Sequence, residues 1–184
     1  IRARHEIDHI GAGQTFAQVP GGKGGNQAVA AARLGAQVSM IGRIGEDANG
    51  ATLRAGLEQE GIDCRALVAT PSSPTGVALI LVDDDGRNSI VIVAGSNGDL
   101  TPDDIARHEP VLAEADVVIC QLETPVATVF AALTAARRLN KTVILNPAPV
   151  AGPLPVQWLP LIDYLIPNEL EAATLTGLPI GSHQ

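Results

Sequence analysis

Apolar and polar residues follow a strand–helix–strand order along the second half of the chain. Almost wholly apolar runs predict buried strands at residues 116–123, 142–146 and 163–168. The stretches between and around these strands predict three helices. The first begins at Thr101-Pro102-Asp103-Asp104 and is broken or restarted at Pro110. The second runs from 125 to about 139, and the third covers 169–175. Strands joined through helices in this way predict right-handed crossovers and a parallel sheet.

The first half of the chain has a different pattern. Residues 1–10 alternate as an exposed strand does, and 11–14 form a turn; a helix over 25–34, a strand over 37–42 and a helix over 49–60 follow. Three β-rich runs come next, at 65–68, 75–82 and 88–93, and we expect them to be antiparallel. A hairpin turn at 83–86 joins the last two. Its aspartates lack the alternating ligands and distal glutamate of a calcium loop, which favours a solvated turn.

Composition supports an α/β fold with one domain. Hydrophobic residues make up 46% of the 184 residues, but only one Trp, one Tyr and two Phe are present. The core must therefore be built from Ala, Val, Leu and Ile, which suits parallel strands covered by helices. The length suggests a single domain.

Charge and cysteine usage exclude several functional classes. The net charge is −8 and no basic cluster is present, so we expect no nucleic-acid partner. We expect no membrane segment and no signal peptide, because no run of about 18 apolar residues exists. Cys64 and Cys120 are far apart, and two reduced thiols in a cytoplasmic protein are the default; a disulfide or a catalytic thiol are the alternatives. The histidines have no metal-ligand spacing.

The stretch Pro20-Gly21-Gly22-Lys23-Gly24-Gly25-Asn26-Gln27 carries the strongest chemical signal. Glycines let a ligand approach the backbone, and the following helix presents free N–H groups and a positive dipole end. A lysine and an amide complete a polar, anion-tolerant floor that suits a polyhydroxy or phosphorylated small molecule. The stretch is neither a Walker A loop nor a dinucleotide fingerprint. A plain glycine-rich turn that caps a helix is the alternative.

Three predicted strands end in polar residues. Glu123, Asn146 and Asn168 follow successive apolar runs. Ligands of open α/β sheets gather at the carboxyl ends of the strands, so these side chains are candidates for one rim. Ordinary polar strand ends would give the same pattern.

These motifs together resemble the ribokinase-like family of carbohydrate kinases. The resemblance covers residues 20–180 and is carried by five segments: 21–35, 75–80, 121–123, 146–149 and 167–171. The Asn146-Pro147-Ala148-Pro149 segment favours the ribose-specific branch over the fructokinase-like and adenosine kinase branches. The resemblance implies a three-layer α/β/α domain over residues 1–184, with antiparallel lid strands around 75–82 and 88–93.

The resemblance also implies residue roles. Asp8, Gly21, Gly22, Lys23, Asn26 and Glu123 would bind the sugar, and Asn168 and Glu171 would form an Asn-x-x-Glu motif at the nucleotide, with Glu171 helping to place Mg²⁺. The implied activity is phosphoryl transfer from ATP to the 5-hydroxyl of D-ribose, in the cytoplasm. A monovalent cation and a homodimer formed through the lid strands are further expectations.

The chain departs from the family pattern in two places. The catalytic aspartate of the family lies in a C-terminal Gly-Ala-Gly-Asp segment that these 184 residues do not contain; Gly11-Ala12-Gly13-Gln14 resembles it only in letters. Only ten residues or so separate the Asp8 segment from the glycine loop, too few for the usual lid hairpin. We therefore expect the 184 residues alone to be inactive, because no general base reaches the sugar hydroxyl.

Three alternatives stay open. The chain could be a non-catalytic remnant that binds sugar or dimerises, or it could be a kinase for another sugar or a nucleoside. A dinucleotide-binding oxidoreductase rests on the strand–helix alternation alone, which is fold-level analogy.

Overall fold

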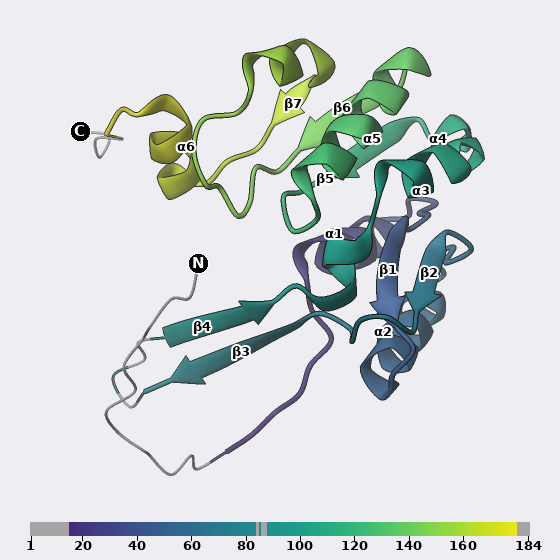
Figure 1. Ribbon diagram of the computed structural model, residues 1–184, viewed down its shortest axis with the longest axis vertical. Helices are drawn as coiled ribbons and strands as arrows, with labels where there is room; N and C mark the ends of the chain where they lie inside the picture. Colours follow the sequence, from purple (N-terminus) through teal and green to yellow (C-terminus); the bar gives the residue numbers. More distant parts are fainter. Residues whose placement is uncertain (1–14, 84, 86–87, 180–184) are drawn as a thin grey trace.

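A computed structural model describes residues 15–83, 85 and 88–179 (Figure 1). The strands are β1 (Gly42–Gly45), β2 (Leu67–Thr70), β3 (Val77–Val82), β4 (Asn88–Val93), β5 (Val117–Cys120), β6 (Thr142–Leu145) and β7 (Tyr164–Leu165). The helices are α1 (Lys23–Arg33), α2 (Ala48–Gln59), α3 (Pro102–Arg107), α4 (Glu109–Glu114), α5 (Val126–Arg138) and α6 (Glu169–Thr176). The predicted strand at 1–10, the turn at 11–14 and Asp8 lie outside the described residues.

The second half forms a three-stranded parallel sheet in the order β5-β6-β7, as the strand–helix alternation predicts (Figure 1). Helix α5 covers one face of this sheet and supplies Leu133 and Ala136, which are fully buried. They pack with Val143 and Leu145 of β6 in the larger core. Trp158 closes that core and stacks on Phe130 of α5, with ring centroids 5.9 Å apart.

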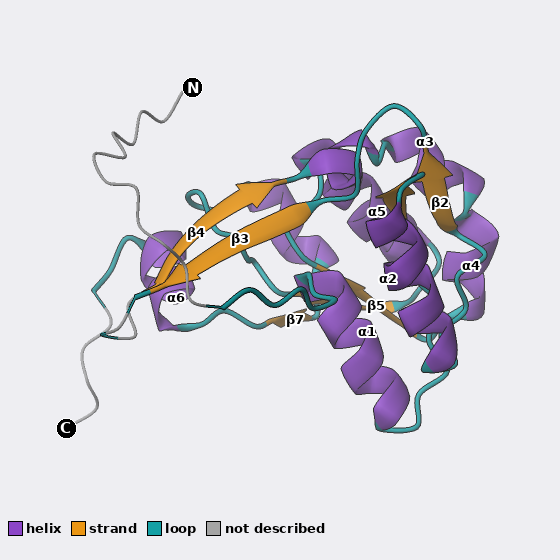
Figure 2. Ribbon diagram, turned by 90° about the horizontal axis from the view of Figure 1, so that it is seen from below, coloured by secondary structure: helices purple, strands orange, loops and turns teal. Residues whose placement is uncertain are grey.

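The first half forms a smaller parallel sheet, β1–β2, that packs with α1 and α2 (Figure 2). Its core contains Ala28 of α1 and Leu57 of α2, together with Ile44 and Leu67 from the two strands. The parallel strands and flanking helices confirm the predicted fold class. Within the described part of the chain, they belong to two separate parallel sheets.

Two strand predictions are wrong in detail. The run 37–42 holds only an isolated bridge between Ser39 and Asp63, and the strand proper is β1, which begins at Gly42. The run 65–68 corresponds to β2, which pairs parallel with β1, so the predicted antiparallel pairing is wrong here. Helix α2 connects β1 to β2 along the chain, and neighbouring strands that are joined by such a crossover helix run parallel.

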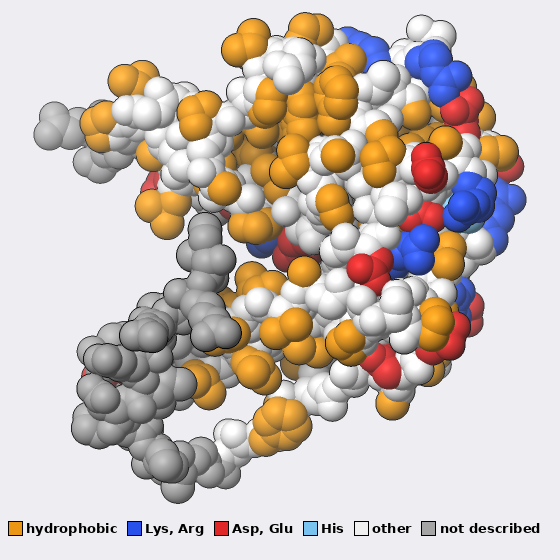
Figure 3. All heavy atoms as spheres, viewed as in Figure 1, with side chains coloured by type: hydrophobic (Ala, Val, Ile, Leu, Met, Phe, Trp, Pro, Cys, Tyr) orange, Lys and Arg blue, Asp and Glu red, His pale blue; other side chains and the backbone are white. Residues whose placement is uncertain are grey.

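The antiparallel prediction is confirmed for β3 and β4, which pair in register from Val77–Val93 to Val82–Asn88. The hairpin projects from the β1–β2 half, and both of its faces carry exposed apolar side chains (Figures 1 and 3). Leu81 and Ile92, for example, are 68% and 63% exposed. This hairpin is the most apolar exposed element that the structure describes.

The root of the hairpin is fixed by Asp47, the N-cap residue of α2. Its carboxylate accepts hydrogen bonds from the backbone N–H of Gly50 (2.8 Å) and from the N–H and hydroxyl of Thr75 (2.8 and 2.6 Å). The Thr75 hydroxyl, followed by backbone N–H groups, lowers the pKa of Asp47. A Cβ at Gly50 would lie 2.2 Å from the carbonyl oxygen of Gly45, so only glycine fits this junction.

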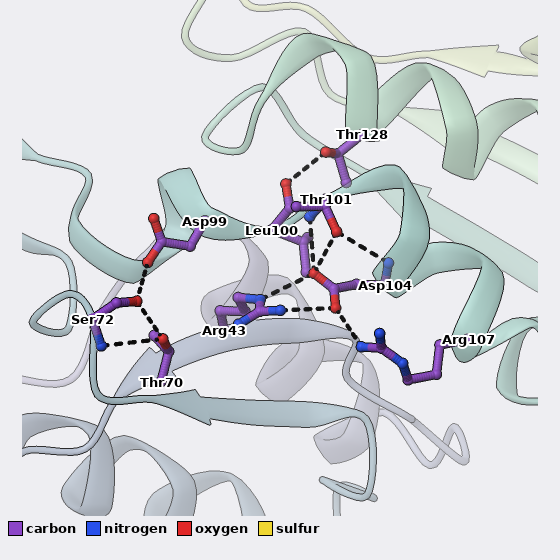
Figure 4. Close-up of polar contacts among 9 residues, drawn as sticks. All are labelled: Arg43, Thr70, Ser72, Asp99, Leu100, Thr101, Asp104, Arg107 and Thr128. Carbon is purple, nitrogen blue, oxygen red and sulfur yellow. Dashed lines mark hydrogen bonds and ion pairs between the residues drawn. The ribbon is translucent and has the colours of Figure 1, made fainter.

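A buried ion pair connects the two halves (Figure 4). Arg43 of β1 donates from Nε and Nη2 to the Asp104 carboxylate of α3, at 3.0 and 2.8 Å. Thr101 and Arg107 donate to the same carboxylate, which is 1% exposed. Thr101 and Asp104 form the predicted capping box, and Pro110 lies in the first turn of α4, which confirms the predicted restart.

Candidate functional site

The carboxyl ends of β5, β6 and β7 lie at one edge of the three-stranded sheet, because the three strands are parallel. Backbone hydrogen bonds continue this order beyond the strands: Asn146 N–H donates to the Cys120 carbonyl and Ile166 N–H to the Leu145 carbonyl, both at 2.9 Å. The residues that follow the strands therefore share one rim. Glu123, Asn146 and Asn168 belong to it, as the sequence predicts.

The glycine loop meets this rim at Glu123. The backbone N–H of Lys23, at the start of α1, donates to Glu123 Oε2 at 2.8 Å. Gly22 caps the helix with φ of +93°, a conformation that favours glycine, and a Cβ there would lie 3.9 Å from the same oxygen. Helix α1 has no acidic residue in its own first turn. Glu123 thus supplies the negative charge that the positive end of the helix dipole favours.

Polar groups remain available at this contact. Within the part of the chain that the structure describes, the Lys23 ammonium and the Asn26 side-chain amide have no hydrogen-bond or ion-pair partner. Lys23 is half-buried and Asn26 is exposed. The loop and the residue it contacts thus carry a cation, an amide and a carboxylate, which are groups that can bind the hydroxyl groups of a small ligand.

Charged side chains also lie in a surface hollow between the β3–β4 hairpin and α6 (Figure 3). Gly21 is exposed, with no atom within 4 Å of its Cβ position, so the backbone of the loop is accessible.

Three side-chain amides connect the loop to the rim, and we call them the amide relay (Gln121, Gln27 and Asn146). Gln121 Nε2 donates to Gln27 Oε1 in a short contact, and Gln27 Nε2 donates to Asn146 Oδ1 at 3.4 Å. Asn146 Nδ2 donates in turn to the carbonyl of Ile166 at 2.9 Å. The sequence prediction gave Gln27 and Gln121 no role. Gln121 precedes Glu123 by two residues, and this closeness to a predicted rim residue was the available signal.

Asn168 and Glu171 form a capping box at the start of α6. Asn168 N–H and Nδ2 donate to the two oxygens of the Glu171 carboxylate, both at 2.9 Å, and Glu171 N–H donates to Asn168 Oδ1 at 2.8 Å. Each carboxylate oxygen keeps an acceptor site. No cluster of three His, Cys, Asp or Glu side chains with metal-binding geometry occurs among the described residues. This donor set fits Mg²⁺ held mainly by water and phosphate oxygens, with one protein carboxylate.

A surface hollow lies at the opposite end of the three-stranded sheet from the rim. A hollow of about 290 Å³ is lined by Arg137, Asn140, Lys141, Thr142 and Asp163, beside the amino end of β6. Both cysteines are free, and burial raises the pKa of the Cys120 thiol to about 12, so it is a poor nucleophile. No helix in the described ranges has the length and apolar character needed to cross a membrane.

Residues 2–184 match the pfkB family of carbohydrate kinases. The chain is 42% identical over 172 residues to a ribokinase of Haemophilus influenzae, which covers 94% of this chain and 56% of that protein. It is 37% identical over 163 residues to a deoxyribokinase of Salmonella typhi, which covers 89% of this chain and 53% of that protein. The chain thus spans about half the length of these relatives.

Solved structures give the same result. The fold is similar to an Arabidopsis thaliana ribokinase complexed with ribose and ATP, with a TM-score of 0.80, 34% identity, and coverage of 88% of this chain and 53% of that one. A ribokinase of Thermotoga maritima gives a TM-score of 0.82 at 32% identity, covering 93% of this chain and 56% of that one. The chain belongs to the pfkB family of carbohydrate kinases.

Proposed function

We propose that the protein is an ATP-dependent sugar kinase that transfers a phosphoryl group to the 5-hydroxyl of D-ribose. The observation that carries this proposal is the contact between Lys23 N–H and Glu123, which brings the glycine loop to the carboxyl ends of the strands. The ribokinase relatives support ribose as the substrate, and the likeness to a ribokinase complexed with ribose and ATP supports both ligands.

In this proposal the sugar lies between the loop and the rim. The accessible backbone of Gly21 and Gly22 and the side chains of Lys23 and Asn26 bind hydroxyl groups from one side. The free oxygen of Glu123 accepts from a hydroxyl on the other side, while its second oxygen stays bonded to Lys23 N–H. Asp8, which lies outside the described residues, is proposed as a further sugar ligand from the sequence resemblance alone.

Asn168 and Glu171 are proposed to face the nucleotide, with Glu171 orienting the water shell of Mg²⁺. Bound Mg²⁺ supplies neutralisation of phosphate charge. The contribution of this chain is positioning: the capping box holds the Glu171 carboxylate in one orientation at the start of α6. The Gly-Ala-Gly-Asp segment that would supply the base is absent from residues 1–184, so we propose that these residues alone do not turn over sugar.

The exposed β3–β4 hairpin is proposed as the lid over the sugar and as the contact between two copies of the protein. Its apolar side chains on both faces support this, because one face can cover the ligand and the other can bury against a partner. Because the reaction consumes ATP, we place it in the cytoplasm. The deoxyribokinase relative makes 2-deoxyribose the second candidate substrate.

The test is an ATP-coupled assay of the full-length gene product with Mg²⁺, using D-ribose, 2-deoxyribose, fructose and adenosine in parallel. We expect ribose to have the highest kcat/KM, and product analysis to show phosphorylation at the 5-hydroxyl. Absence of turnover with every pentose and hexose would refute the kinase. Formation of ribose 5-phosphate by residues 1–184 alone would refute the proposed lack of a base.

A further inference from the structure

The amide relay links two segments that the proposed reaction must hold in fixed relation. One end is Gln121, whose partner Gln27 belongs to α1, the helix that carries Lys23 and Asn26 in its first turn. The other end is the Ile166 carbonyl, two residues before Asn168. The relay thus connects the proposed sugar loop to the entry of the proposed nucleotide motif. Its side chains are half-buried, and two of its links join residues 94 and 119 positions apart.

The relay has a single hydrogen-bond direction. A carbonyl oxygen can only accept, so Ile166 fixes which end of the Asn146 amide donates. The remaining Asn146 oxygen then requires the nitrogen of Gln27, and the Gln27 oxygen requires the nitrogen of Gln121. The three side chains are therefore oriented as a unit. Replacing one of them disturbs the others.

Glycine at position 24 makes the close approach of the relay feasible. A Cβ at Gly24 would lie 3.2 Å from Gln121 Oε1 and 3.2 Å from Met40 Cε. Gln121 therefore lies directly against the first turn of α1. Together with the bond from Lys23 N–H to Glu123, it fixes this turn to the end of β5 at two points.

We propose that Gln27, Gln121 and Asn146 are positioning residues that align the sugar loop with the nucleotide motif, an inference that rests on the proposed kinase function. None of the three needs to touch the reacting atoms. When the relay is broken, the bond from Lys23 N–H to Glu123 still attaches the residues proposed to bind the sugar to the end of β5. Loss of the relay should therefore leave sugar binding largely intact and impair the alignment on which phosphoryl transfer depends.

The test uses the full-length gene product and Gln27→Met, which keeps side-chain length and charge but removes both hydrogen bonds. We expect kcat to fall by roughly 10–100-fold, the scale of a misplacement of about 1 Å, with little change in KM for ribose. Gln59→Met is the matched control, because Gln59 is exposed on α2 and has no hydrogen-bond partner among the described side chains. Combining Gln27→Met with Asn146→Ala should cost less than the two single losses multiplied together.

A second variant and a second measurement separate this proposal from the kinase assignment. Gln27→Glu still accepts from Gln121 but cannot donate to Asn146, so its kcat should fall even if Gln27→Met folds poorly. Hydrogen exchange should also become faster at residues 164–171 in either variant and not in Gln59→Met. A kcat equal to that of the control overturns the proposal. If the unsubstituted protein has no activity, the kinase assignment fails, and unchanged exchange at 164–171 then overturns the relay as well.

Discussion

The Asp104 carboxylate should contribute strongly to the stability of the fold. It is 1% exposed and accepts five hydrogen bonds, from Arg43 (two), Thr101 (two) and Arg107 (one). Asp104→Ala would leave the Arg43 guanidinium, whose side chain is only 19% exposed, without its partner. Removing one member of a buried ion pair costs about 3–5 kcal/mol, because the other charge stays buried and uncompensated.

Urea unfolding, followed by circular dichroism, measures this loss. Asp103→Ala is the matched control: Asp103 lies in the same first turn, is exposed, and should contribute only about 0.3–1 kcal/mol through the helix dipole. A midpoint shift for Asp104→Ala no larger than that for Asp103→Ala would refute the claim that this pair holds the two halves together.

The same pair predicts a pH dependence. Arg43, followed by Thr101, holds the pKa of Asp104 well below its usual range. A carboxyl whose pKa is lower in the folded than in the unfolded state stabilises the fold above its unfolded pKa, near 4, and loses this contribution as pH falls further. Unfolding free energy should therefore drop more steeply below about pH 4 in the unsubstituted protein than in Asp104→Asn. Parallel slopes would contradict this assignment.

Three further predictions concern single side chains. Gly50→Ala should lower the free energy of unfolding by about 1–3 kcal/mol, because the new Cβ would lie 2.2 Å from the Gly45 carbonyl oxygen. Gly56→Ala in the same helix should raise it by up to about 1 kcal/mol, because no atom lies within 4 Å of the new Cβ. Thermal unfolding of the two variants measures the difference. Glu123→Ala should weaken ribose binding by roughly 10–150-fold, which corresponds to the loss of one hydrogen bond to a charged group. Calorimetry measures the affinity, and an unchanged value would show that Glu123 is not part of the proposed sugar site. Ile80→Glu, at a side chain that is 58% exposed, should abolish a hairpin-mediated dimer in sedimentation, and a dimer of undiminished affinity would place the interface elsewhere.

Local signals predicted much of this fold. The helix starts at Thr101 and Asn168 were predictable because a capping box is completed within four residues. The end of α6 was predictable because Gly177 adopts the left-handed conformation that closes helices. The strand β1 was placed too early, because the apolar residues before it suggest a strand more strongly than its own sequence, Gly-Arg-Ile-Gly.

The connections between distant segments were not predictable. The partner of Arg43 is 61 residues away, and nothing near either residue marks them as a pair. The amide relay was missed for the same reason, because glutamine and asparagine are ordinary surface residues until the fold brings their amides together. The strand ends were more informative, since parallel strands must place their carboxyl ends at one edge, and Glu123 and Asn146 follow from that rule.

The contact at Glu123 also explains how the proposed sugar loop can be ordered before a ligand binds. Glycines lose the most conformational entropy on ordering, so a loop with this composition needs bonds from outside itself. The bond from Lys23 N–H to Glu123 is one such bond, and it comes from a residue 100 positions away. A site held in this way has less ordering left to do when the sugar arrives, which favours affinity and alignment together. On this reasoning the end of β5 is as much a part of the proposed sugar site as the glycine loop.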